Sequence, residues 1–434
     1  MSIYDYESAF GAVDKTTKAM RNAVEDWFSL YYDAQVSSHE DPGQRIAYTV
    51  VGKLLKAIFG EYAVTAADPI CQNWLNSMDI CKETAVQLAM VGGECYIKPC
   101  PAQDGFRFAL IPRDRVLIFA RDIHGTPVDV GTVQNTAWGK YYYTLLERRS
   151  LDENGYLTIE NRLYRSGDSS ALGTQVALSE HPAFAGLPDC YRYETPVGSV
   201  GLVRMKTPML NCVDGSPEGV AVYAAVAGLI RSINENEAQL GGEFSRGESR
   251  VIVSKDMLTD GQLQDHLFVG LDEDPEAVGM TVFSPQLRID AYLARKQEYL
   301  RNVESMVGLR RGMLSDADLQ DRTATEITSS AGDFNLTVIG LQRMWQAALE
   351  EGVTLCVKLA RLYHMAVPDD LSFNVDWGNS TLYDEDKTWE QYRQMVADGL
   401  MAPEVALGWR FNLPASTEAE RQIIRKRYMP QETV

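Results

Sequence analysis

The sequence predicts an α+β fold divided among several structural lobes. With 434 residues, the chain is longer than a single compact core usually holds. Its composition, 45% hydrophobic and 23% charged, is typical of an ordered protein rather than of a disordered or repetitive one. Apolar residues recur at helical spacing up to about Met90, alternate as in strands from Glu94 to about residue 210, and then return to helical spacing.

The N-terminal lobe is predicted to combine three helices with antiparallel strands. The helices cover residues 14–33, 46–59 and 69–90. Beyond them, runs of aromatic and β-branched residues flank Asp152-Glu153-Asn154-Gly155, a pattern typical of a β-hairpin. Residues 94 to about 210 are therefore expected to be mostly antiparallel β.

A long helix is predicted next, from Ser216-Pro217-Glu218 to about Leu240. These first residues supply a cap, a proline at the first helical position and a carboxylate at the positive end, and Gly241-Gly242 is expected to end the helix. Several apolar residues near its start would be poorly covered by one small helical pair, so we expect neighbouring copies of the chain to bury them. They are Val220, Val222, Val226, Leu229 and Ile230.

The rest of the chain is predicted to be mainly helical. A short polar segment with one clear strand, Arg250–Val253, precedes a second long helix over residues 288–307. The capping-box sequence Thr323-Ala324-Thr325-Glu326 opens a very long helix that reaches about His364, and a second capping box lies at Thr417–Glu420. The stripe of the long helix that we expect to be buried consists of Leu341, Trp345, Leu349, Leu355, Leu359 and Leu362.

The charge of the chain limits its partners. It carries 41 basic and 60 acidic residues, a net charge of −19, and its pI is near 4.8. A surface this acidic repels free DNA, which disfavours a conventional DNA-binding domain.

The longest apolar run, Val220 to Ile230, is shorter than the roughly 20 residues of a membrane-spanning helix, and no export signal is visible. We therefore expect no membrane partner, and reduced thiols at the seven cysteines.

The residue patterns of common enzyme sites are missing from the sequence. It has no phosphate-binding loop ending in Gly-Lys-Ser/Thr, no His-Glu-x-x-His zinc helix and no Gly-x-Ser-x-Gly nucleophile elbow. The acidic run from Asp272 to Glu276 lacks the spacing and the glycine of a calcium loop. We expect no catalysis, no metal and no cofactor; a metal-dependent hydrolase that uses scattered carboxylates stays open as an alternative.

Four short segments occur in a characteristic order. Asp214-Gly215-Ser216-Pro217 leads into the first long helix, and Tyr392 to Met401 lies near the end of the chain. Between them, Val307 to Leu314 and Arg322 to Ile327 flank the loop before the longest helix. In this joint order, over nearly the whole chain, the segments resemble those of the portal proteins of tailed bacteriophages, especially of the siphophage type.

The resemblance implies a portal-like fold with a named sequence of parts. These are a helical and antiparallel-β wing (1–212), a first stem helix (213–242), a small clip (243–286), a second stem helix (287–307), a tunnel loop (308–322), a long wing helix (323–365) and a short helical crown (366–434). The crown is shorter than an extended C-terminal helical barrel would require.

The resemblance also implies a function. Such proteins form a ring, a dodecamer in the virion, at one vertex of the capsid, assembled in the host cytoplasm. Double-stranded DNA passes through the ring without sequence-specific binding, while the terminase large subunit, a head–tail adaptor and the major capsid protein dock on it. Another capsid or head–tail adaptor protein, without long stem helices, is the alternative within this class.

Candidate contact residues follow from the same resemblance. Those expected at the DNA channel, in the tunnel loop, are Arg310, Arg311, Ser315 and Asp316. Those expected to meet the adaptor or terminase, in the clip, are Arg250, Asp272, Glu273 and Asp274.

The local charge differs between two segments. Residues 243–276 hold three basic and nine acidic residues, a net −6, and residues 286–312 hold six basic and three acidic residues, a net +3. An acidic lining would keep DNA from sticking, and a few cations would centre it; salt bridges between neighbouring subunits are the alternative for the charges on the helices.

Overall fold

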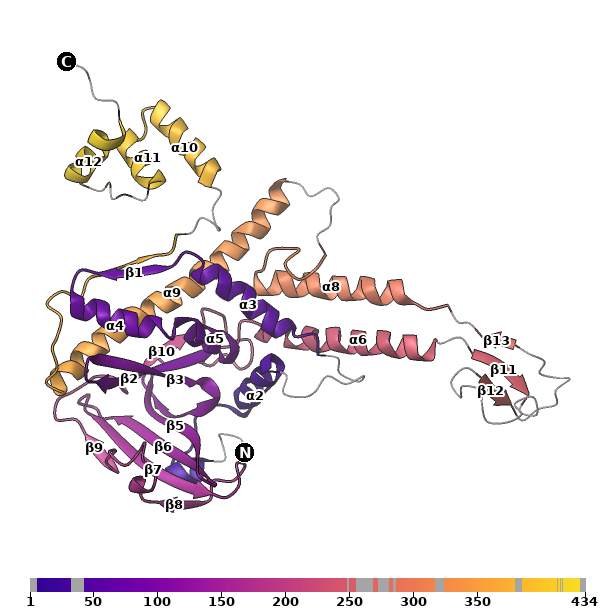
Figure 1. Ribbon diagram of the computed structural model, residues 1–434, viewed down its shortest axis with the longest axis horizontal. Helices are drawn as coiled ribbons and strands as arrows, with labels where there is room; N and C mark the ends of the chain where they lie inside the picture. Colours follow the sequence, from indigo (N-terminus) through magenta and orange to yellow (C-terminus); the bar gives the residue numbers. More distant parts are fainter. Residues whose placement is uncertain are drawn as a thin grey trace. The chain divides into compact units, whose positions relative to one another are not determined.

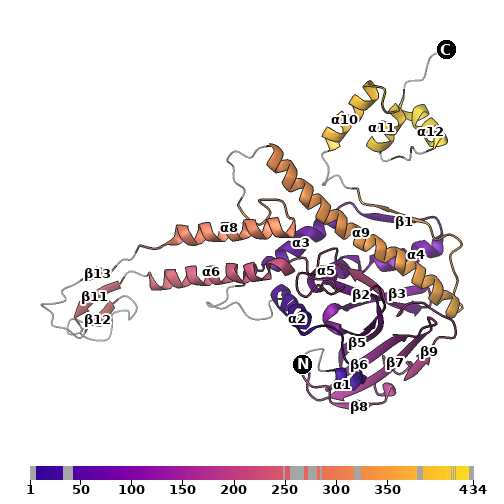
Figure 2. The ribbon, with the colours of Figure 1, turned by 180° about the vertical axis from the view of Figure 1, so that it is seen from behind.

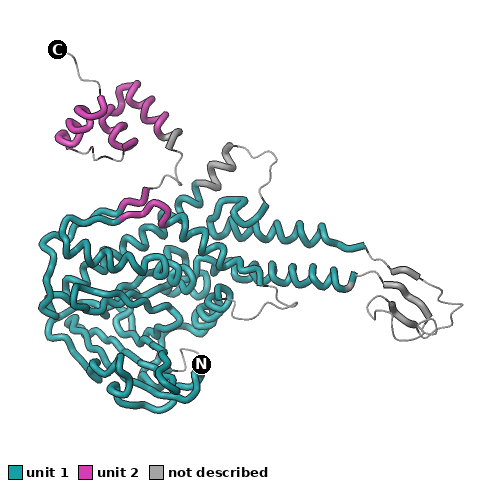
Figure 3. The backbone as a smooth tube through the Cα atoms, in the orientation of Figure 1, with its two compact units in different colours: residues 1–58, 64–375 teal, residues 59–63, 376–434 magenta. Residues whose placement is uncertain are grey.

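The computed structural model confirms the mixed helix and sheet class of the chain (Figure 1). It describes residues 6–32, 43–247, 250–254, 268–271, 281–283, 286–316, 324–378, 385–411, 413, 415 and 417–429. The chain divides into two compact units, coloured separately in Figure 3. One comprises residues 1–58 and 64–375, and the other comprises residues 59–63 and 376–434.

The three predicted N-terminal helices are present, with one correction. Helices α2 and α3 cover Lys18–Tyr32 and Ile46–Phe59, and a short helix that was not predicted, α1 (Glu7–Phe10), precedes them. The helix predicted over residues 69–90 is two helices, α4 (Pro69–Asp79) and α5 (Lys82–Gly92). The Asp68 side chain caps α4 by accepting hydrogen bonds from the backbone N–H groups of Ile70 and Cys71, at 2.8 and 3.1 Å.

The predicted antiparallel β region is confirmed and forms two sheets. The smaller has the order β10-β2-β3, with β2 at Glu94–Ala102, β3 at Gly105–Pro112 and β10 at Val203–Lys206. The larger has the order β4-β5-β6-β7-β8, and β9 also pairs with β7. Its strands are Val116–Arg121, Pro127–Trp138, Tyr141–Leu151, Leu157–Ser166, Thr174–Val176 and Cys190–Arg192. The predicted hairpin joins β6 to β7, where Leu151 faces Leu157.

The first long helix starts later than the sequence predicts. Helix α6 covers Ala227–Arg246, so the cap predicted at Ser216-Pro217-Glu218 is wrong and Gly241-Gly242 does not end the helix. Residues 216–223 are instead held in the wing: the N–H of Val222 donates to the carbonyl of Met90, at 2.9 Å, and Thr207 Oγ1 donates to the carbonyl of Val220, at 2.7 Å.

This placement overturns the expectation that neighbouring copies bury the apolar residues after Pro217. Val220, Val222, Val226 and Ile230 are at most 5% exposed within the single chain, and Leu229 is half-buried. The wing and the first turn of α6 cover them, because residues 216–221, which were expected to be helical, have no regular secondary structure and are hydrogen-bonded to the wing.

The second long helix, α8 (Ile289–Val307), lies beside α6 and runs in the opposite direction (Figures 1 and 2). Asn236 Nδ2 donates to the carbonyl of Tyr292 at 3.1 Å, and Lys296 pairs with Glu237 at 2.7 Å. Between the helices, β11 (Arg250–Ser254), β12 (Phe268–Leu271) and β13 (Thr281–Phe283) form a sheet in the order β12-β11-β13. Only β11 was predicted; it pairs parallel with β12 and antiparallel with β13.

The longest helix, α9, covers Ala324–Leu362 and packs against β10, β2 and α4. Its predicted buried stripe is confirmed at Leu341, Trp345, Leu349, Leu355 and Leu359, while Leu362 is half-buried. Gly352 allows close packing, since a Cβ there would lie 2.7 Å from Sδ of Met78. The capping residue predicted for this helix, Thr323, lies outside the described residues. Beyond α9, β14 (Phe373–Asp376) pairs with β1 (Ala63–Ala66).

The second unit contains three short helices, α10 (Glu385–Ala397), α11 (Pro403–Arg410) and α12 (Glu418–Tyr428). The predicted capping box at Thr417 is confirmed: its side chain accepts from the N–H of Glu420, and its own N–H donates to the Glu420 carboxylate. Arg425 of α12 pairs with Glu404 of α11 at 2.6 Å. A small helical C-terminal part is therefore present.

A buried ion cluster joins the wing to the segment that enters α6. Arg113 pairs with Glu218 at 2.6 Å and lies 4.0 Å from Glu94, and all three side chains are at most 2% exposed. Arg204 also pairs with Glu94, and Arg121 pairs with Glu218 at 2.7 Å. Burial alone would raise the pKa of Glu94, but Arg204 and Arg113 outweigh it and lower that pKa to about 2. Glu94 therefore stays ionised inside the wing.

We expect Arg113→Met to lower the free energy of unfolding by about 3–5 kcal/mol, because it leaves two carboxylates buried beside a missing cation. Arg107→Met is the matched control: its pair with Asp104 is exposed, so a loss of at most about 1 kcal/mol is expected. Urea unfolding of the full chain, followed by tryptophan fluorescence, measures both. Equal losses in the two variants would contradict this role of the cluster.

The same cluster should make the protein acid-sensitive. The pKa of Glu94 is about 2 in the fold and 4.5 ordinarily, so its contribution to stability is complete above about pH 5 and is lost as the pH falls toward 2. The urea midpoint of the unaltered protein should therefore fall over this range, and it should fall less steeply in Glu94→Gln. Parallel curves would contradict the prediction.

Candidate functional site

The loop between α8 and α9 begins in the conformation that its glycines permit. Gly308 ends α8 with a φ of +79°, and Gly312 has a φ of +89°. Other residues adopt such angles only with strain, and a Cβ on Gly308 would also lie 2.3 Å from Oγ1 of Thr337. Both glycines are therefore required by the path of the chain.

One buried glutamate organises this loop. The carboxylate of Glu304, in the last turn of α8, accepts hydrogen bonds from the backbone N–H groups of Gly312, at 3.1 Å, and Ser315, at 2.8 Å, and from that of Leu314. It also accepts the hydroxyl of Ser315 at 2.8 Å. Because the Glu304 residue is only 1% exposed, these bonds replace its contacts with water. Residues 312–315 are thus clamped to the end of the helix, and we call these bonds the Glu304 clamp.

The two arginines predicted to face DNA lie in the clamped loop and differ in their surroundings. Arg310 is half-buried: its guanidinium lies 5.0 Å from the centre of the Phe334 ring and donates to Oδ1 of Asn335 at 3.1 Å. Arg311 is exposed. Arg310 therefore contacts α9, and Arg311 is the more exposed of the two.

The other two predicted loop residues have different roles. Ser315 is 6% exposed and its hydroxyl is occupied by the clamp, so it positions the loop. Asp316 is exposed, and its backbone N–H donates to Oε1 of Gln297, at 2.8 Å. All four predicted loop residues therefore lie in the short segment that directly follows α8, residues 310–316.

The clip residues can be placed only in part. Arg250 begins β11, where it faces Phe283 of β13 in the backbone register. The other three predicted clip residues, Asp272, Glu273 and Asp274, lie outside the described residues. The contact surface predicted for this segment stays a prediction.

Glu304 is the functional residue that the sequence analysis missed. The signal was present, because Glu304 lies in the apolar stripe of α8 that contains Leu300, Val303 and Val307. A carboxylate in a buried stripe, one turn before a helix-ending glycine, indicates that backbone N–H groups of the following loop will fold back onto it.

The cations of the helical pair are largely balanced within the chain. Arg288 pairs with Glu243 at 2.9 Å, Lys296 with Glu237 at 2.7 Å, and Arg301 lies 3.9 Å from Glu298. Salt bridges between neighbouring copies were the alternative for these charges; the structure shows these three cations near carboxylates of the same chain.

Two further features concern the described residues only. No group of three or more histidine, cysteine or acidic side chains lies close enough together there to bind a metal ion. Within the same part of the chain, no helix combines the length and hydrophobicity that crossing a lipid bilayer requires. Among known proteins, no family profile matches the sequence and no curated protein is significantly similar to it.

We expect Glu304→Gln to open the loop, because an amide cannot accept three N–H groups and a hydroxyl in the same way. Limited trypsin digestion should cleave after Arg310 or Arg311 about tenfold faster or more, since losing one charged hydrogen bond costs about 1.5–3 kcal/mol. Mass spectrometry of the fragments identifies the site. Glu298→Gln, an exposed position on the same helix, is the control and should behave as the unaltered protein. Equal rates in both variants would show that the clamp does not hold the loop.

Proposed function

We propose that this chain is the subunit of a portal: a closed ring at one vertex of a phage capsid through which double-stranded DNA enters and leaves. The chain performs no hydrolysis, and a separate terminase motor supplies the energy while docked on the segment between α6 and α8. The major capsid protein and a head–tail adaptor are its further partners in the virion.

The observation that carries the proposal is the succession of parts from α6 to α9. Two antiparallel helices are joined by a small three-stranded sheet, and a clamped loop with two arginines leads into a 39-residue helix that packs on the wing. This is the order of stem, clip, tunnel loop and long wing helix that the sequence resemblance implies. An adaptor without long stem helices does not account for α6 and α8.

Support for a ring comes from the surface of the helical pair. No residue from Gln286 to Tyr299 is buried, so the first half of α8 has no core of its own within the chain. Leu293 of α8 and Phe244 of α6 are each 47% exposed. Apolar surface on so thin an element is typical of a contact with another subunit. Leu293 and Phe244 therefore take the place of the residues near Val220 as the expected contacts between copies, because the chain itself buries the latter.

The charge of the chain supports a passive channel. A net charge of −19 disfavours tight binding of DNA, whereas exposed loop cations permit weak contacts with phosphates that do not depend on sequence. Magnesium-dependent turnover of a phosphoester would instead favour the metal-dependent hydrolase.

The ring is tested by two substitutions in the helical pair. We expect the unaltered protein to be a cyclic oligomer with a central hole in negative-stain images, and Leu293→Glu and Phe244→Glu to shift it toward the monomer. Light scattering measures the mass. Ile123→Glu is the control, because Ile123 is 94% exposed in the turn between β4 and β5, outside the pair. A homogeneous 48.4 kDa species for the unaltered protein at micromolar concentration would overturn the proposal.

The channel loop is tested by reversing its charge. Arg311→Glu, alone and combined with Arg310→Glu, should leave the ring intact. It should reduce DNA packaging, because the introduced carboxylates repel the phosphates of DNA. Packaging is measured as the amount of nuclease-protected DNA in filled heads. Arg343→Glu makes the same charge change at an exposed position of α9 and should package normally. Normal packaging by the loop variants would show that the loop does not steer DNA by charge. Loss of the ring would show that these arginines hold the subunits together.

A further inference from the structure

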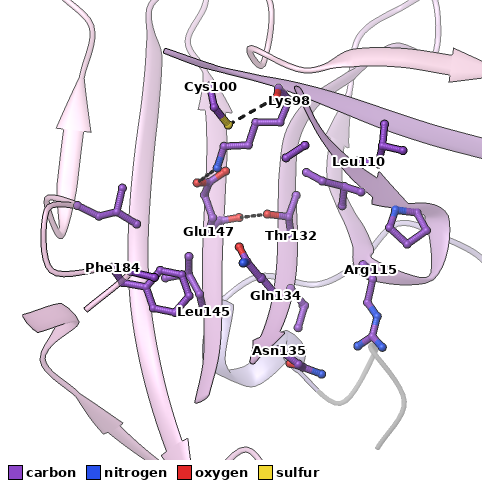
Figure 4. A pocket seen from close by; sticks show the side chains of 16 residues that line it. Lys98, Cys100, Leu110, Arg115, Thr132, Gln134, Asn135, Leu145, Glu147 and Phe184 are labelled. Carbon is purple, nitrogen blue, oxygen red and sulfur yellow. Dashed lines mark hydrogen bonds and ion pairs between the residues drawn. The ribbon is translucent and has the colours of Figure 1, made fainter. Parts of the chain in front are cut away.

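The wing contains a cleft that the proposed portal function does not use. It has a volume of about 620 Å³ and lies between β2 and β3 on one side and β5 and β6 on the other (Figure 4). This volume is in the range of sites that bind small molecules or short peptide segments. Its apolar lining comes from Ala109, Ile111, Leu145, Phe184 and Leu187.

Two open strand edges border the cleft. Among the described strands, β3 pairs only with β2, and β4 pairs with β5 only as far as Thr132. Val133–Trp138 of β5 therefore have β6 on one side and no described strand on the other. Four consecutive residues of β3, Ala109–Pro112, and four of β5, Thr132–Asn135, line the cleft. Side chains alternate between the two faces of a strand, so consecutive lining residues place the backbone edges themselves at the cleft.

The charges at the cleft favour an acidic occupant. Glu147 accepts hydrogen bonds from Lys98, at 2.5 Å, and from Arg149, at 2.6 Å. Burial alone would raise the pKa of Glu147, but Arg149 and Lys98 outweigh it and lower that pKa to about 2. The lining contains the carboxylate of Glu147 and the cations Lys98 and Arg115, a net charge of +1 in a chain whose net charge is −19. Arg115 also lies 3.8 Å from Asp114, which does not line the cleft. The side chain of Arg115 is 43% exposed.

We propose that this cleft binds an extended peptide segment of a partner protein in which apolar and acidic residues alternate. The segment adds as a strand beside the open edge of β5, where unpaired backbone groups bind its main chain. Its apolar side chains pack against Ile111 and Leu145, and its acidic side chains lie near Lys98 and Arg115. The inference rests on the wing alone and is independent of ring formation.

The probe is a short blocked peptide of alternating valine and glutamate that carries a fluorescein label. The comparison peptide has lysine in place of glutamate. Fluorescence anisotropy with the full chain should show binding of the glutamate peptide that is at least about tenfold tighter than that of the lysine peptide and that weakens with added salt.

Two substitutions locate the binding. The side chain of Ala109 shares the cleft face with Lys98, its cross-strand partner, and it is exposed, so Ala109→Trp should fold and fill the cleft. It should weaken binding of the glutamate peptide about tenfold or more. Ala171→Trp, at an exposed position outside the cleft, should not change it. Arg115→Glu should weaken the glutamate peptide and strengthen the lysine peptide, because it reverses the charge beside the strand edge.

The proposal is overturned if neither peptide binds, if both bind equally, or if Ala109→Trp binds as the unaltered protein does. Octanoate, a small apolar carboxylate, distinguishes a different occupant. The contrary result is that octanoate binds to the unaltered protein and not to Ala109→Trp, while the glutamate peptide binds to neither. That result would show that the cleft is a small-molecule site and that the peptide proposal is wrong. A failure of the ring experiments leaves this measurement unaffected, because all cleft residues lie in the wing.

Discussion

The buried ion cluster around Glu218 is the interaction on which the architecture of this chain depends most. It holds the segment before α6 against the wing by pairing Glu218 with Arg113 and Arg121. The N–H of Gly219 donates to Glu94, so the backbone of the segment joins the same cluster. An ionised group at this depth is stable only when cations and hydrogen-bond donors surround it, and every member therefore requires the others. The cluster determines where the wing stops and where the helical pair begins.

Glu304 performs a comparable role where the helical pair returns to the wing. In both places a buried carboxylate anchors a segment with no regular secondary structure of its own. Glu218 receives guanidinium groups, whereas Glu304 receives backbone N–H groups and one hydroxyl. Both ends of the α6–α8 pair are thus held at defined points. Residues 308–316, which include Arg310 and Arg311, consequently have a defined shape, whereas the glycines alone would have allowed many.

The distribution of charge connects these features to the proposed channel. The chain is strongly acidic, and the cations of the helical pair are matched by carboxylates on the same pair. Arg311 in the loop is exposed, whereas Lys98 and Arg115 beside the cleft are half-buried and lie near the carboxylates of Glu147 and Asp114. Weak, salt-sensitive attraction at a few such positions suits a molecule that must guide a polyanion without holding it.

The sequence by itself determined the elements whose signals are local. The 3.6-residue periodicity of α2, α3, α8 and α9, the alternation of β6 and β7 around Asp152-Glu153-Asn154-Gly155, and the capping box at Thr417 each depend on neighbouring residues only, and the structure has all of them. The predicted loop residues also lie together because they are adjacent in the chain.

Only the tertiary structure decided the features that depend on distant partners. Ser216-Pro217-Glu218 has good local signals for a helix start, yet Glu218 pairs with Arg113, 105 residues away, and the segment has no regular secondary structure. The strands β12 and β13 form because they pair with β11 across long separations in a polar stretch, and the clamp forms because Glu304 is buried. Leaving the buried Arg113 without Glu218 would cost about 3–5 kcal/mol, more than the roughly 1 kcal/mol that a helix cap contributes. No pattern of neighbouring residues reveals which distant arginine will pair with Glu218.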